Sequence, residues 1–285
     1  MRVLVAFKIV PNLEDLTESD WEIGPNLTPE LTYARPMVNP DDESALELAL
    51  RLRDARGKNE NGAFETYLSA VTLGDTPAAR RISQTLMALG FSKVGLVGVN
   101  DNGPFAPDLA ARYLSPWAGG DFHLILTGQS SADGQNGLTS KYLARLLGYE
   151  LISEVVGLKS LSAQKIEVES LTDDGLLRQT LAGPTILSVG NAPSAFLRVP
   201  TLKDRLKYSK AHPELLPGPG QSSGADFPGS NLPGPNLPGK SFADLVSLKR
   251  EAKTRKTTLV TQGSAEDKAA LILKALKDWG LKNGD

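Results

Sequence analysis

Short apolar runs bounded by glycine, proline or polar residues recur along the first two-thirds of the chain. Runs of about four to eight residues that are rich in β-branched side chains predict buried strands. The predicted strands are Val3–Phe7, Tyr67–Leu73, Lys93–Val97, Phe122–Thr127 and Thr185–Val189.

Between these runs, apolar residues recur at the spacing of a helix. One helix is predicted to begin after Pro40, where Asp41 and Asp42 complement the helix dipole, and to end at Gly57. Further helices are predicted over residues 77–89, 108–114 and 138–147. Strands that alternate with helices predict a mainly parallel sheet covered on both faces, which is a doubly wound, Rossmann-like α/β fold.

The pattern changes between residues 151 and 181, where shorter antiparallel strands are predicted. These strands cover residues 151–161, 166–171 and 177–181, and the Asp173-Asp174-Gly175 sequence predicts the turn of a hairpin. The sequence therefore predicts a small antiparallel excursion before the last strand of the parallel sheet.

The C-terminal quarter of the chain differs in composition from the rest. Residues 213–240 are rich in proline, glycine and serine, and such a segment cannot bury enough apolar surface to fold alone. A basic helix over 241–256 and an amphipathic helix over 265–281 are predicted to follow. We therefore expect an α/β domain over residues 1–211 and an extended arm with helices over 212–285. The apolar stripe of the last helix would pack on a partner subunit, or otherwise on the chain's own body.

Composition excludes several classes of site. The chain has no cysteine and two histidines, so disulfides, thiolate nucleophiles and histidine-rich zinc sites are not expected. A net charge of −2 gives no case for nucleic acid, although acids dominate residues 1–66 and bases dominate residues 198–256. No apolar stretch approaches the roughly 20 residues that cross a bilayer, and the first apolar run is too short for a signal peptide. We expect a cytoplasmic protein without membrane insertion.

The loop over residues 128–137 is the main candidate binding element. It follows a predicted strand, precedes a predicted helix, and carries three glycines together with serine and asparagine. Backbone amides of such a loop, together with a helix N-terminus, form a common anion site. The loop is longer than the roughly 2–6 residues that usually join a strand to a helix. A phosphate cradle and an ordinary connection are therefore both open interpretations.

Three familiar motifs do not occur at the predicted strands or in the 128–137 loop. The dinucleotide pattern G-x-G-x-x-G does not follow the first strand, and the Walker pattern G-x-x-x-x-G-K-[ST] does not follow any predicted strand. No G-x-S-x-G pattern exists that would make Ser130 or Ser131 the nucleophile of a serine hydrolase. We therefore expect no catalytic acid, base or nucleophile in this chain.

The order and spacing of several motifs resemble the β subunit of electron transfer flavoproteins. Residues 39–43 (Asn-Pro-Asp-Asp-Glu) line up with the family pattern N-P-[FY]-[DC]-E, and residues 128–137 line up with G-x-Q-[AS]-x-D-G-D-x-G without a gap. Thr201, Leu202 and Leu206 match [ST]-L-x-x-x-[MLI] after a short insertion. Looser matches occur at residues 88–92, 184 and 191–193. The resemblance covers residues 1–211.

This resemblance implies one subunit of a heterodimeric electron carrier. In such proteins the α subunit holds most of the redox FAD, and the β subunit binds an adenine nucleotide, either AMP or a second FAD. Electrons would pass from a flavoprotein dehydrogenase to an acceptor. The implied partner-docking residue is Leu202. The implied nucleotide-binding residues are Ala6, Asn39, Pro40, Asp41, Asp42, Leu73, Gly128, Gln129, Ser130, Ser131, Asp133, Gly134, Gln135, Asn136, Gly137, Leu138 and Thr139.

Two of the matched acids carry further expectations. Asp133 should brace the loop or hold a hydroxyl, because a carboxylate should not face a phosphate. Asp41 stands where the family has an aromatic residue that approaches the α-subunit flavin, and a carboxylate there would lower the flavin potential. Leu13 stands where some members have tyrosine.

One alternative of a different class stays open. A non-redox regulatory or structural module of the same fold would bind an adenine nucleotide without a flavin-bearing partner. The two functions differ in one observable, because an electron carrier purified with its α subunit should be yellow and reducible.

Overall fold

The computed structural model describes residues 1–17, 31, 34–57, 65–99, 106–119, 122–162, 165–181, 183–190, 192 and 196–218. All of them belong to one compact unit, residues 1–230. The helices predicted over 241–256 and 265–281 lie outside the described residues, and the division of the chain at residue 212 stays a prediction. In the described part of the chain, no helix combines the length and apolarity needed to cross a membrane.

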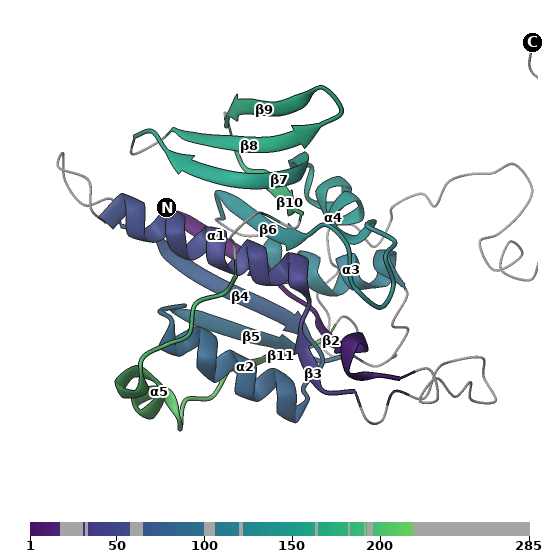
Figure 1. The fold of residues 1–285 in the computed structure, drawn as a ribbon, viewed down its shortest axis with the longest axis vertical. Coiled ribbons are helices and arrows are strands. Elements are labelled where there is room, and N and C mark those ends of the chain that lie inside the picture. The colour runs from purple at the N-terminus through teal and green to yellow at the C-terminus, as the bar shows by residue number, and fades with distance from the viewer. Residues whose placement is uncertain are drawn as a thin grey trace, which may run out of the picture. The chain divides into compact units, whose positions relative to one another are not determined.

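A nine-stranded sheet runs through this unit (Figure 1). Its strand order is β11-β5-β4-β1-β6-β10-β7-β8-β9. Every neighbouring pair from β11 to β7 is parallel, and the β7–β8 and β8–β9 pairs are antiparallel. The strands are β1 (Arg2–Ala6), β4 (Tyr67–Leu73), β5 (Lys93–Val97), β6 (Leu124–Gly128), β7 (Glu150–Ser160), β8 (Ile166–Thr172), β9 (Gly175–Thr180), β10 (Thr185–Val189) and β11 (Glu214–Leu216).

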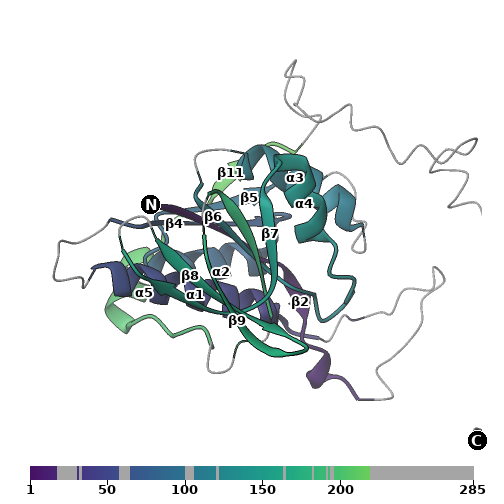
Figure 2. The ribbon, with the colours of Figure 1, turned by 90° about the horizontal axis from the view of Figure 1, so that it is seen from above.

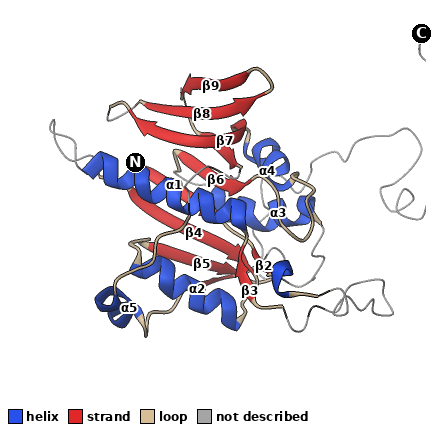
Figure 3. Cartoon of the chain, viewed as in Figure 1, coloured by secondary structure: helices blue, strands red, loops and turns tan. Residues whose placement is uncertain are grey.

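Helices cover both faces of the sheet, as Figures 2 and 3 show. Two separate hydrophobic clusters lie on the two faces, one under α1 and α2 and the other under α3 and α4. The predicted doubly wound α/β class is therefore confirmed. The helices are α1 (Pro40–Gly57), α2 (Pro77–Ala88), α3 (Pro107–Ala118), α4 (Thr139–Leu147) and the short α5 (Leu202–Tyr208). The strands β2 (Ile9–Pro11) and β3 (Pro36–Val38) form a separate antiparallel pair, with the 3-10 turn η1 (Leu13–Asp15) between them.

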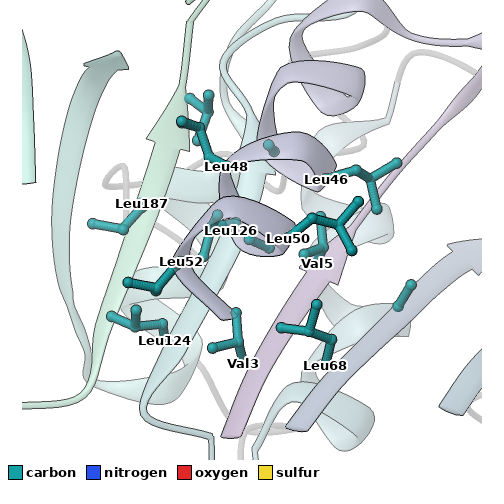
Figure 4. Close-up of a cluster of buried hydrophobic side chains, with 14 of the residues drawn as sticks. Val3, Val5, Leu46, Leu48, Leu50, Leu52, Leu68, Leu124, Leu126 and Leu187 are labelled. Carbon is teal, nitrogen blue, oxygen red and sulfur yellow. The ribbon is translucent and has the colours of Figure 1, made fainter. Parts of the chain in front are cut away.

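The larger cluster forms where α1 lies across the centre of the sheet (Figure 4). Four leucines of α1, spaced two residues apart, are buried, so the helix is covered over more than its sheet-facing side. Leu197 packs against the same cluster and contributes to the burial of α1 beyond its sheet-facing side. The α1 leucines are Leu46, Leu48, Leu50 and Leu52, and they lie over Val3, Val5, Leu68, Leu124, Leu126 and Leu187.

Most predicted elements are found within one or two residues, but four details differ. Pro116 lies inside α3 rather than beyond its end, and the Ser115 hydroxyl donates to the Arg112 carbonyl, near the site of the missing proline amide. The predicted strand at 151–161 is one long strand, β7, that pairs with β10 and then with β8. Neither β11 nor α5 was expected. Residues 214–216, predicted to begin the arm, instead form the edge strand β11 of the sheet.

Candidate functional site

A cavity of about 410 Å³ opens beyond the carboxyl ends of β1, β4 and β6. This is the edge at which doubly wound sheets bind ligands. Its walls come from the strand ends, from the loop after β6, and from the first turns of α3 and α4. The lining residues are Ala6, Phe7, Lys8, Ile9, Asn39, Asp42, Thr72, Leu73, Gly74, Thr76, Val99, Ala106, Pro107, Ala110, Leu114, Thr127, Gly128, Gln129, Ser130, Ser131, Asn136, Gly137, Leu138 and Thr139.

Asp42 ties together the two strand ends at the base of this cavity. Its carboxylate accepts hydrogen bonds from the amide of Lys8, just beyond β1 (2.8 Å), and from the amide of Gly128 at the end of β6 (2.5 Å). The side chain is 6% exposed. Burial raises the pKa of Asp42 to about 7, although the amides of Lys8 and Gly128 act in the opposite direction. The group therefore titrates near neutral pH.

Asn39 and Asp41 hold the next part of the loop. The Asn39 amide group donates to the Ser130 carbonyl (2.7 Å) and accepts from the Ala132 amide (2.9 Å). The Asp41 carboxylate accepts from the amide and the hydroxyl of Ser130 (3.0 and 3.2 Å). The motif at residues 39–42 thus binds the 128–132 backbone, and Asn39 and Asp42 also line the cavity.

Lys8 fixes the far side of the loop through Asp133. Its ammonium group lies 2.7 Å from both carboxylate oxygens of Asp133 and 3.5 Å from the Ser131 hydroxyl. Asp133 therefore braces the loop, which is one of the two roles expected from the sequence. Lys8 was not among the predicted site residues. Lys8 could have been identified from its position in the sequence, because it is a charged residue directly after an apolar strand.

Residues 136–139, at the end of the loop and the start of α4, line the cavity, and we call them the cradle. Gly137 has φ +60°, and a Cβ atom at this position would lie 3.2 Å from the Gln129 carbonyl oxygen. The Asn136 side chain accepts from the Leu138 amide (3.2 Å). Among the described residues, no side chain caps α4 at Leu138 or α3 at Ala106. Uncapped first turns leave amide donors that an anion can satisfy.

The opposite wall of the cavity is apolar. It comes from strand ends at Ala6 and Leu73, which were predicted, and from three residues that were not. These are Val99 after β5 and Ala110 and Leu114 on α3. An apolar wall facing a cradle of amides suits a ligand that has a flat base at one end and a phosphate at the other.

Most of the remaining predicted residues lie around the cavity rather than on its described lining. Pro40 begins α1 beside the brace formed by Asn39 and Asp41. Gly134 and Gln135 donate their amides to the Ser131 carbonyl in the outer turn of the loop. Gln129 is part of the described lining, and its side chain is bonded to Glu154 of β7.

The predicted docking residue Leu202 lies on a separate surface. It is the first residue of α5, is 73% exposed, and is followed by the exposed Leu206. The segment leading to α5 is fixed to α1 by Arg198, whose guanidinium binds the buried Glu47 (2.8 Å) and Asp54 (2.5 Å).

Comparisons with known proteins identify one family. Residues 32–203 match the model of the electron transfer flavoprotein domain. The chain is 31% identical to a putative electron transfer flavoprotein subunit, YgcR, of Escherichia coli, over 74% of this chain and 79% of that protein. It is 24% identical to the acryloyl-CoA reductase electron transfer subunit gamma of Anaerotignum propionicum, over 74% of this chain and 75% of that subunit. It is also 30% identical to the electron transfer flavoprotein subunit beta of Bradyrhizobium diazoefficiens, over 56% and 60% of the two chains.

The first prediction concerns the close approach of Gly128 to α1. A Cβ atom at Gly128 would overlap the Asp42 carboxylate and lie 2.9 Å from the Asp42 amide nitrogen. Gly128→Ala should therefore lower the free energy of unfolding by about 1–3 kcal/mol, measured by urea titration. Gly183→Ala is the control, because nothing in the described part of the chain lies within 4 Å of its added Cβ. Equal stability of the two variants would contradict the close contact.

The second prediction concerns pH. The folded pKa of Asp42 is about 7, against an ordinary value of 3.8, so the folded chain binds this proton more tightly than the unfolded chain. The stability due to Asp42 should be complete below about pH 4 and lost as the pH rises to about 7. Urea titrations should show the wild type losing stability over this window relative to Asp42→Asn, whose side chain does not titrate.

A second carboxylate provides the control for this prediction. Burial alone would raise the pKa of Asp54, but hydrogen bonds from Arg53 and Arg198 lower it overall. Asp54→Asn should therefore show the opposite trend, because the wild-type benefit disappears as the pH falls. A pH-independent difference between wild type and Asp42→Asn would contradict the raised pKa of Asp42.

Proposed function

The chain belongs to the electron transfer flavoprotein family, and we propose that it is the β subunit of a heterodimeric carrier that binds an adenine nucleotide in the cavity. The observation that carries the proposal is an apolar wall opposite the start of α4, whose first turn no side chain of the described residues caps, at the ligand-binding edge of the sheet. The matched family region, residues 32–203, includes both Asn39–Asp42 and the cradle.

In this proposal the nucleotide lies across the cavity. The base packs on the wall formed by Ala6, Leu73 and Val99, and the phosphate lies against the amides at the start of α4. AMP and a second FAD share this adenosine phosphate portion, which is the part that the described lining addresses. Lys8 is the one cationic side chain in the described lining, and its bond to Asp133 keeps it beside the cradle.

The redox chemistry belongs to a flavin rather than to this chain. FAD, held by or shared with the α subunit, would accept electrons from a flavoprotein dehydrogenase and pass them to an acceptor. The residues of this chain bind the nucleotide, fix the loop, and present a docking surface. A non-redox nucleotide-binding module of the same fold is the alternative, and it differs in having no flavin-bearing partner.

The docking surface in this proposal is the exposed apolar side of α5 and the segment before it. Leu202, Leu206 and Phe196 are exposed apolar residues on an otherwise basic segment. Lys203, Arg205 and Lys207 add positive charge, which would steer an acidic partner while the leucines anchor it.

The third prediction tests nucleotide and flavin content together. The complex with the α subunit should be yellow and should hold one FAD plus either AMP or a second FAD, counted by absorbance and mass spectrometry. Gly137→Asp places a negative charge in the cradle and should remove the AMP or second FAD. Gly148→Asp is the control, because Gly148 has a similar φ of +67° but caps the far end of α4. Stoichiometric retention of the nucleotide by Gly137→Asp would exclude the cradle, and a colourless complex would exclude the carrier role.

The fourth prediction tests docking. Leu202→Ala should lower the rate at which the dehydrogenase reduces the complex by about tenfold at limiting concentration, because an anchoring side chain is lost. Leu215→Ala is the control, since Leu215 is also exposed but lies on β11. Stopped-flow flavin absorbance measures the rate, and nucleotide content should not change. Unchanged kinetics in Leu202→Ala would exclude docking at this residue.

A further inference from the structure

Thr127 has a buried hydroxyl group without a hydrogen-bond partner. Within the described residues, only two buried side-chain polar atoms lack one, the Thr127 hydroxyl and the Trp117 indole nitrogen. Thr127 is 5% exposed and lines the cavity, whereas Trp117 packs near Gly95 on β5. A buried hydroxyl with no hydrogen-bond partner destabilises the folded chain. A ligand bound in the cavity would supply the partner that Thr127 lacks.

The strand pattern directs the Thr127 side chain to the cavity face of the sheet. Side chains alternate along a strand, and Ile125, two residues earlier, belongs to the cluster under α3 and α4. The laterally paired residues are Ala6 on β1 and Ser188 on β10. Ser188 contacts the Ser140 hydroxyl of α4 (3.5 Å), so the neighbouring hydroxyl on this face has a protein partner.

Thr127 also lies between the two halves of the cavity. On one side is Ala6, at the start of the apolar wall, and on the other is Gly128, the first residue of the loop. A nucleotide that places its base on the wall and its phosphate on the cradle has its ribose between them. We propose that the Thr127 hydroxyl forms a buried hydrogen bond with a ribose hydroxyl of the bound nucleotide. This inference rests on the proposed adenine-nucleotide function.

A purely structural role predicts that substitution by valine changes stability but not AMP affinity. If Thr127 only filled space in a strand, valine would be the better residue, since it has the same shape and no hydroxyl to desolvate. If the hydroxyl binds the ligand, valine should stabilise the ligand-free chain and weaken binding. The two readouts therefore move in opposite directions only under the proposal.

The experiment compares wild type, Thr127→Val and Thr127→Ser in the full-length chain freed of nucleotide. AMP affinity is measured by calorimetry, and the melting temperature is measured without ligand. Thr127→Val should bind AMP about tenfold more weakly, and its melting temperature should rise by about 2–4 °C. Thr127→Ser keeps the hydroxyl and should retain most of the affinity.

Thr185 offers a matched control in the same sheet. It is fully buried, and its hydroxyl donates to the Gly183 carbonyl (2.9 Å), at the opposite end of β10 from the cavity. Thr185→Val should therefore lower the melting temperature and leave AMP affinity unchanged. A fall in AMP affinity in this control would mean that the loss in Thr127→Val is not specific to the cavity.

Deoxy analogues identify the bonded group. One analogue, either 2′-deoxy-AMP or 3′-deoxy-AMP, lacks the hydroxyl that Thr127 binds. Wild type and Thr127→Val should bind that analogue with equal affinity. The same loss with AMP and both analogues would overturn the ribose contact, as would equal AMP affinity of wild type and Thr127→Val. Failure of the wild-type chain to bind AMP, ADP or FAD would instead overturn the proposed function, and the inference with it.

Discussion

The Asp42 carboxylate is the constraint on which the cavity edge depends. Its backbone belongs to the first turn of α1, and its two oxygens accept from amides at the ends of β1 and β6. One side chain thus joins a helix to two neighbouring strands at the point where the sheet opens. Burying a carboxylate is costly, and the two amides and the helix dipole offset that cost only in part, so its pKa rises. The close approach also explains glycine at residue 128, because a side chain there would occupy the space of the carboxylate.

Beyond this fixed point, further side chains hold the loop in place. Asn39 and Asp41 bind its first residues, and Lys8 binds Asp133 further along. Acids close to a phosphate site would repel the ligand if they faced it, but Asp41 is bonded to Ser130 and Asp133 is neutralised by Lys8. The first turn of α4, which no side chain of the described residues caps, lines the cavity beyond the loop. Asp41 therefore has a structural partner within this chain.

The sequence predicted the fold well and the site in part, for physical reasons. Elements such as β4 and β5 carry the pattern of buried residues in their own sequence. This local pattern was sufficient to predict them. The strand β11 forms on the edge of β5, whereas α5 is a short helix that is capped by Thr201 and lies beside α2; neither leaves a periodic signal. Lys8 and Thr127 belong to the site because of what lies beside them in space. Pairing across strands that are more than 100 residues apart in sequence cannot be read from spacing.

Helix α1 mechanically links the two surfaces that the chain presents. Its N-terminal turn holds the loop through Asp41 and Asp42, and its outer face holds Arg198 through Glu47 and Asp54. The docking segment therefore depends on the same buried helix as the cradle. Under the proposed function, a nucleotide bound to the loop that α1 braces would stabilise the folded state in which the proposed docking segment is positioned.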